Sequence, residues 1–148
     1  MNCLSLSLLL LFPATLLAGT EYNEWYRDNI GTLSVITQTE KNGPVFVSIA
    51  AGGTSGANVV ITLMQACNEQ QASALLWVNN VQQKVRFHCD HVNNMSLTSY
   101  IIDDASRANV IYSSLKSGFT VVLDKRIKIW AANINTPDSA GLYSPGTW

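Results

Sequence analysis

The spacing of apolar and polar residues predicts a chain built mainly of β-strands. Residues 31–39 are rich in β-branched side chains, with Leu33 and Val35 two positions apart, as one face of a strand requires. The segment 41–44 reads Lys-Asn-Gly-Pro, in which Asn-Gly accepts positive φ and Pro suits the first residue of a strand. With 45–50 as the returning strand, the pattern predicts a hairpin.

The same kind of pattern predicts more strands further along the chain, at 58–67, 74–78, 84–89, 119–123 and 127–131. Asn79-Asn80 is a predicted turn between two of these strands, and residues 124–126 turn between the last two. Residues 91–96 are polar, and residues 136–148 carry Pro145 and Gly146, so we expect both segments to be irregular.

Residues 103–118 form the predicted helix. Apolar residues recur at helical spacing, at Ala108, Ile111, Tyr112 and Leu115. Asp103 or Asp104 suits the N-cap, and Gly118 suits the left-handed position after the last turn. A strand through 109–112 is the alternative, because Val and Ile are poor helix formers. The capping residues at both ends favour the helix.

The N-terminus predicts export. Leu4–Phe12 is an uncharged apolar run, too short to cross a bilayer and typical of a signal peptide. The small residues Ala18 and Gly19 suit cleavage, so we expect a signal peptide at 1–18 and a single β-rich domain at 19–148. A buried N-terminal strand or helix is the alternative, and the abrupt change to polar sequence at Glu21 argues against it. The predicted location is secreted or periplasmic, and no later segment is long enough to span a membrane.

The cysteines support the same compartment. Cys3 would leave with the signal peptide, and the remaining pair, Cys67 and Cys89, is predicted to form a disulfide in an oxidising environment. The sequence His-Cys-Asp-His at 88–91 suggests metal ligands. However, Cys89 is the only partner for Cys67, and alternation along a strand turns His88 away from Cys89. We therefore expect no metal site and no cofactor.

Composition and motifs exclude several functions. The net charge is −1 and charged residues make up 13% of the chain, which argues against a nucleic-acid-binding protein. The basic cluster at 125–128 is better explained as a turn. No G-x-S-x-G motif is present, and the Gly-rich 52–56 lacks the Lys of a phosphate-binding loop. We therefore expect a protein that is not an enzyme. The low charge, with 47% hydrophobic residues, suggests that a partner covers part of the surface.

Binding is the function that remains. Sugar recognition uses aromatic faces and amide groups, which this chain supplies at Trp77, Trp130, Trp148, Asn79, Asn80, Asn133 and Asn135. The alternative is that the tryptophans of the predicted strands fill the core. Asn94-Met95-Ser96 is a glycosylation sequon, which has meaning only in a eukaryotic host.

The order of elements resembles that of a known fold. This order is similar to that of the five-stranded OB-fold barrel of bacterial toxin B subunits: a signal peptide, a β-meander, one helix ending in Gly, and then a pair of strands. Residues 31–36 and 108–123 look like subtilase-cytotoxin B-subunit-like and pertussis-toxin-like proteins. Residues 129–137 also resemble the Trp/Asn/Thr-Pro stretch near the end of cholera-like B subunits.

This resemblance implies a small OB-like barrel that assembles as a homopentamer, binds cell-surface glycans and delivers a toxin A subunit. Trp130 and Asn133 carry over as ligand-binding residues, and Trp77 is our third candidate. The alternative is a monomeric periplasmic β-sandwich that binds another protein as an inhibitor or immunity-type protein. In both cases the predicted class is mostly β with one helix.

Overall fold

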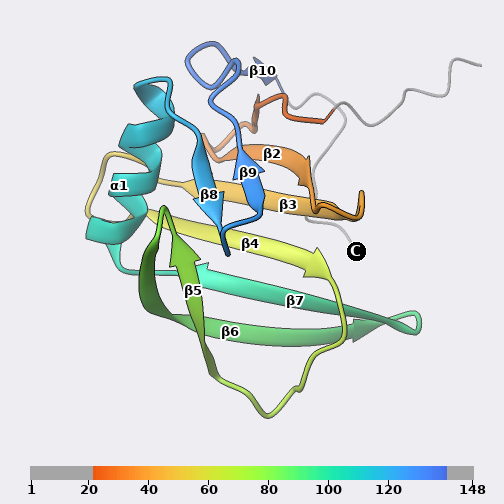
Figure 1. The fold of residues 1–148 in the computed structure, drawn as a ribbon. Helices are drawn as coiled ribbons and strands as arrows, with labels where there is room; N and C mark the ends of the chain where they lie inside the picture. Colours follow the sequence, from red (N-terminus) through yellow and green to blue (C-terminus); the bar gives the residue numbers. More distant parts are fainter. Residues whose placement is uncertain (1–21, 140–148) are drawn as a thin grey trace, which may run out of the picture.

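The computed structural model describes residues 22–139, which contain ten strands and one helix (Figure 1). The strands are β1 (Tyr26–Arg27), β2 (Leu33–Gln38), β3 (Pro44–Ala50), β4 (Asn58–Met64), β5 (Ser73–Val78), β6 (Val81–Val92), β7 (Met95–Ile102), β8 (Val121–Leu123), β9 (Ile127–Ile129) and β10 (Asp138–Ser139), and the helix is α1 (Ala105–Lys116). No helix within these residues is long and apolar enough to cross a membrane. The predicted signal peptide and Trp148 lie outside the described residues.

The strands form one mixed sheet in the order β10-β1-β2-β3-β4-β7-β6-β5-β8-β9. β1 and β10 are parallel, and all the other neighbours are antiparallel. Figure 1 shows the long strands β2, β3, β4, β7 and β6 running across the view, with β5, β8 and β9 crossing in front of them. The core lies between these two parts of the sheet, where Ile61, Leu76 and Leu123 are buried. α1 adds Ala108, Ile111 and Leu115 to the same core.

Several predictions from the sequence are confirmed. β2 and β3 form the first hairpin, and the turn between β5 and β6 places Asn79 and Asn80 at φ of 46° and 67°. α1 begins after Asp104, whose carboxylate accepts a hydrogen bond from the Arg107 amide at 3.0 Å. It ends before Gly118, which adopts φ of 88°. The alternative of a strand through 109–112 is therefore wrong.

The prediction of a loop at 91–96 is wrong. β6 continues to Val92 and β7 begins at Met95, so that a two-residue turn at Asn93-Asn94 joins two long strands. β7 is hard to predict from the sequence because two of its core-facing positions are Thr98 and Tyr100. These residues weaken the apolar alternation that predicts a strand. A short strand, β10, likewise interrupts the segment that was expected to be irregular.

The prediction of a mostly β fold with one helix is confirmed, but the strand ladder does not close. β9 ends the sheet and lies beside β2 without pairing with it. The hydroxyl of Thr37 on β2 instead donates to the backbone carbonyl of Lys128 on β9 at 2.8 Å. The result is a curled open sheet with a seam between β2 and β9.

Candidate functional site

A shallow groove lies along the seam between β2 and β9. Its volume is about 210 Å³. One wall comes from the end of β2 and the residues that follow it, and the other comes from β9 and its flanking residues. The lining residues are Asn23, Thr37, Gln38, Thr39, Glu40, Arg126, Lys128 and Trp130. The groove therefore combines one aromatic ring, two amides, two hydroxyls and three charged side chains.

Trp130 supplies the aromatic surface of the groove. It is 44% exposed, whereas the neighbouring Ile129 is fully buried. The ammonium of Lys128 lies 5.7 Å from the centre of the Trp130 ring. An indole held at the surface presents a flat apolar face together with a polar N–H group, which suits stacking against a ligand.

The backbone of Trp130 is fixed from below by a second tryptophan. Trp25 is fully buried, and its indole Nε1 donates to the carbonyl oxygen of Trp130 at 2.8 Å. Asn133 holds Trp25 in turn, since its Oδ1 accepts from the Trp25 amide at 2.7 Å and its Nδ2 donates to the Trp25 carbonyl at 3.1 Å. Both polar atoms of the Asn133 side chain are therefore used in positioning Trp25.

Asn23 contributes a polar atom with no partner. Its Oδ1 is buried and accepts no hydrogen bond. The backbone N–H of Asn23 donates to the Ile36 carbonyl at 2.7 Å. This bond holds Asn23 against β2 in a left-handed backbone conformation with φ of 66°. An unsatisfied buried acceptor costs roughly 1–3 kcal/mol, and rotation of the Asn23 side chain toward the groove would bring this oxygen to a donor there.

The charges of the groove are also available to a ligand. None of the ion pairs within residues 22–139 involves Glu40, Arg126 or Lys128. Two cations and one carboxylate give this surface a small positive excess. Arg126 and Lys128 belong to the basic cluster at 125–128, for which the sequence predicts only a turn. The turn between β8 and β9 places both residues at the seam.

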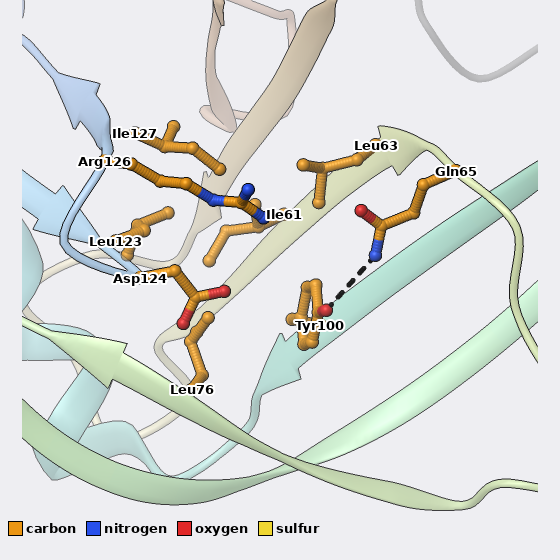
Figure 2. A pocket seen from close by; sticks show the side chains of 9 residues that line it. All are labelled: Ile61, Leu63, Gln65, Leu76, Tyr100, Leu123, Asp124, Arg126 and Ile127. Atoms are coloured by element: carbon orange, nitrogen blue, oxygen red, sulfur yellow. Dashed lines mark hydrogen bonds between the residues drawn. The ribbon is translucent and has the colours of Figure 1, made fainter. Parts of the chain in front are cut away.

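Arg126 also lines a small cavity between β4, β7 and the turn that joins β8 to β9 (Figure 2). There the Gln65 side chain donates to the Tyr100 hydroxyl at 3.4 Å, and Ile61, Leu76 and Ile127 form apolar walls. Burial raises the pKa of Tyr100 above its ordinary value of 10.0, and the nearby Asp124 carboxylate acts in the same direction. The cavity volume is about 10 Å³, enough for about one water molecule, so the groove is the better candidate for a ligand.

Of the predicted ligand-binding residues, only Trp130 lines the groove. Asn133 lies beneath it in the contact with Trp25. Trp77 on β5 is partly exposed outside the groove, under the Lys125 ammonium at 4.2 Å from the ring centre. No pattern in the sequence points to Asn23, Gln38 or Glu40, because each of them becomes part of a site only when β9 lies beside β2.

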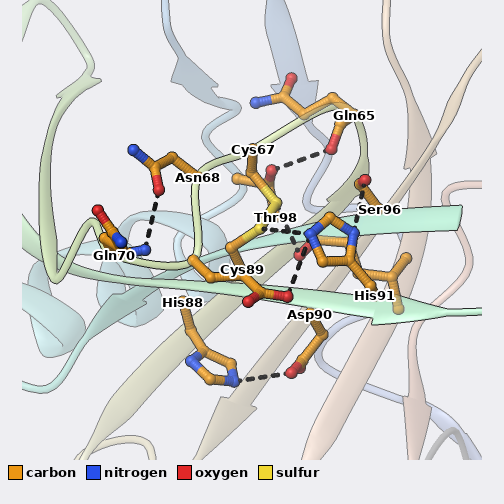
Figure 3. Close-up of polar contacts among 12 residues, drawn as sticks. Gln65, Cys67, Asn68, Gln70, His88, Cys89, Asp90, His91, Ser96 and Thr98 are labelled. Atoms are coloured by element: carbon orange, nitrogen blue, oxygen red, sulfur yellow. Dashed lines mark hydrogen bonds and ion pairs between the residues drawn. A yellow bond between two sulfur atoms is a disulfide. The ribbon is translucent and has the colours of Figure 1, made fainter.

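The Cys67–Cys89 disulfide is present, as predicted (Figure 3). His91 lies beside it, paired with Glu69 at 3.2 Å and with Ser96 at 2.9 Å. His88 pairs separately with Asp90 at 3.0 Å. In the part of the chain that the structure describes, no three His, Cys, Asp or Glu side chains are grouped to hold a metal ion.

Comparisons of this chain with protein-family models, with curated proteins and with solved structures found no match. The interpretation of the site therefore rests on its own geometry.

Proposed function

We propose that this chain is a secreted or periplasmic binding protein without catalytic activity, and that the groove at the β2–β9 seam binds a glycan. The observation that carries the proposal is the exposed ring of Trp130, held in place through its backbone by the buried Trp25. Sugar rings stack on such aromatic faces through their C–H groups, while their hydroxyls need amide and carboxylate partners of the kind that line this groove.

The size of the groove limits how much of a glycan it holds. Its volume of about 210 Å³ is below the roughly 300–1,000 Å³ of typical small-molecule pockets. We therefore propose that it takes one terminal part of an oligosaccharide and leaves the rest in solvent. On binding, the Asn23 side chain would turn toward the groove, and its unpartnered Oδ1 would accept a hydrogen bond from a hydroxyl or amide of that terminal sugar.

A glycan array followed by titration of the best ligand tests the proposal. We expect Trp130→Ala to weaken binding at least about tenfold, which corresponds to about 1.4 kcal/mol. Trp77→Ala is the matched control, because it removes a partly exposed tryptophan that lies outside the groove, and it is expected to retain the wild-type affinity. Equal affinity of Trp130→Ala and wild type, or an array with no bound glycan, would contradict the proposal.

We further propose, on the resemblance to toxin B subunits, that the chain forms an OB-like barrel within a ring oligomer that carries a toxin A subunit. The hydrogen bond from Thr37 to the Lys128 carbonyl supports the barrel part of this proposal, since it links the two strands that a closed barrel would pair. Mass measurement in solution tests the ring. A monomer that binds no glycan would favour the alternative of an inhibitor or immunity-type protein.

A further inference from the structure

Within residues 22–139, one broad surface is formed by strands that contain no charged side chain. The strands β2, β3, β4 and β7 are neighbours in the sheet, and none of them contains Asp, Glu, Lys or Arg. Alternate residues of each strand are buried in the core, and the residues between them lie on the opposite side of the strand. The strands β5, β8 and β9 cross the core side of these strands (Figure 1). We call the side opposite the core the uncharged face. Its large apolar side chains are Ile36, Phe46, Val60, Met64, Leu97 and Ile101.

The register of the strands places these apolar side chains next to one another. Ile36 lies opposite Phe46, Val60 lies opposite Ile101, and Met64 lies opposite Leu97. Met64 is 49% exposed. Cross-strand pairs of this kind form continuous apolar rows, which gain free energy when they are removed from water.

The polar groups between the rows are already partly satisfied. The hydroxyls of Thr62 and Ser99 hydrogen-bond to each other at 2.9 Å in the middle of the face. Burying this pair would therefore leave one of its two hydroxyl hydrogens without an acceptor instead of both, which lowers the cost of covering a polar sheet surface.

We propose that the uncharged face packs against the same face of a second copy of this chain, around a two-fold axis. A strongly charged partner finds no complementary charge here, whereas a second copy brings an equally neutral surface and no repulsion. On the neighbouring strand β6, the side chain of Arg86 is paired with Asp103 at 3.1 Å and that of His88 with Asp90. Lys84 lies on the same side of β6 and is in none of the ion pairs within residues 22–139, so the margin of the face carries one unpaired cation.

The size of the face sets the strength of this association. Four strands at about 4.8 Å spacing and about six residues in length cover roughly 19 Å by 20 Å, or about 400 Å². A stable interface uses about 800 Å² on each partner, so we expect a reversible dimer that forms at micromolar concentrations. If the chain also forms rings, the same contact pairs two rings, and the number of copies is again even.

The test is the mass of the mature protein in solution, measured by sedimentation across a concentration series. We expect the wild-type particle to contain an even number of chains. The Thr62→Arg and Val60→Lys variants should contain half that number, since each substitution places a charge at the centre of the face. Gln82→Arg is the control, because it adds the same charge on the outer side of β6, and it should keep the wild-type mass. The midpoint of thermal unfolding of each variant checks that it is folded.

An odd number of copies, a monomer at all concentrations, or a mass unchanged by both central substitutions would overturn the proposal. The wild-type concentration series decides the matter even if one variant does not fold. This inference depends on the sheet and is independent of the glycan proposal. Of the groove residues only Gln38 lies on the uncharged face, at the end of β2, and both substitutions lie two strands away on β4, so the folded variants should bind any glycan ligand per chain as the wild type does.

Discussion

Trp25 and Trp130 are joined by a hydrogen bond of 2.8 Å from the buried indole of the first to the backbone carbonyl of the second. They lie 105 residues apart in the sequence, at opposite ends of the described chain. The contact ties the segment before β1 to the segment after β9, and it determines where the exposed ring of Trp130 stands. The stability of the N-terminal segment and the shape of the groove are therefore linked.

Replacement of Trp25 by Phe tests this link. The change leaves most of the apolar volume but removes the donor to Trp130, and an unsatisfied carbonyl costs roughly 1–3 kcal/mol in free energy of unfolding. Urea denaturation should detect that loss, together with weaker ligand binding in the groove. Trp77→Phe is the control, because Trp77 is partly exposed and outside the groove, and it should have the smaller effect. Equal stabilities of Trp25→Phe and wild type would show that the bond contributes nothing.

Gly52 is predicted to be intolerant of a side chain. A Cβ atom at this position would lie 2.7 Å from the Tyr112 ring of α1, closer than such atoms pack. We expect Gly52→Ala to lower the free energy of unfolding by about 1–3 kcal/mol, because Tyr112 or the loop must move. Gly56→Ala, where the nearest atom is 3.7 Å away, should be near neutral. Chemical denaturation of the two variants side by side makes the comparison, and similar values for both would refute the steric explanation.

The Cys67–Cys89 disulfide is predicted to stabilise the fold mainly by limiting the unfolded chain. Its sequence separation of 22 residues corresponds to about 3 kcal/mol in the loop-entropy estimate. We expect the double variant Cys67→Ala/Cys89→Ala to unfold at lower urea concentration than wild type. A reductant should lower the wild-type midpoint toward that of the variant and leave the variant unchanged. A wild type insensitive to reductant under unfolding conditions would be the contrary result.

Tyr100 predicts a loss of stability in alkaline solution. Burial raises the pKa of its hydroxyl in the folded state above 10.0, so the folded protein retains this proton at a pH where the unfolded chain has lost it. The resulting contribution is fully present below pH 10.0 and is lost as the pH rises through the folded-state pKa. Unfolding measured at a series of pH values should give a steeper alkaline decline for wild type than for Tyr100→Phe. Parallel declines would mean that Tyr100 does not contribute to it.

Elements whose signals are local could be predicted from the sequence. The Asp104 carboxylate and Gly118 mark the two ends of α1, and Asn79-Asn80 marks a two-residue turn. Each of these depends on the preferences of a few adjacent residues. β7 escaped prediction because Thr98 and Tyr100 take core-facing positions, where a pattern search expects aliphatic side chains.

The groove could be predicted only in part. The sequence makes Trp130 a candidate ligand-binding residue, with burial in the core as the alternative, and it gives no sign that the Asn133 amide holds Trp25. Nothing near Asn23 or Glu40 indicates that β9 will lie beside them. That contact is set by the curl of the whole sheet, a property that no short segment encodes.

The seam between β2 and β9 is closed by side chains and not by strand pairing. One hydrogen bond, from the Thr37 hydroxyl to the Lys128 carbonyl, joins the two strands, and no ladder of backbone hydrogen bonds links them. The buried side chains of Ile127 and Ile129 and the hydrogen bond from Trp25 to Trp130 hold the same two walls together. The width of the groove is therefore set by side chains, and substitutions at the seam can change it while every strand pair of the sheet stays in place.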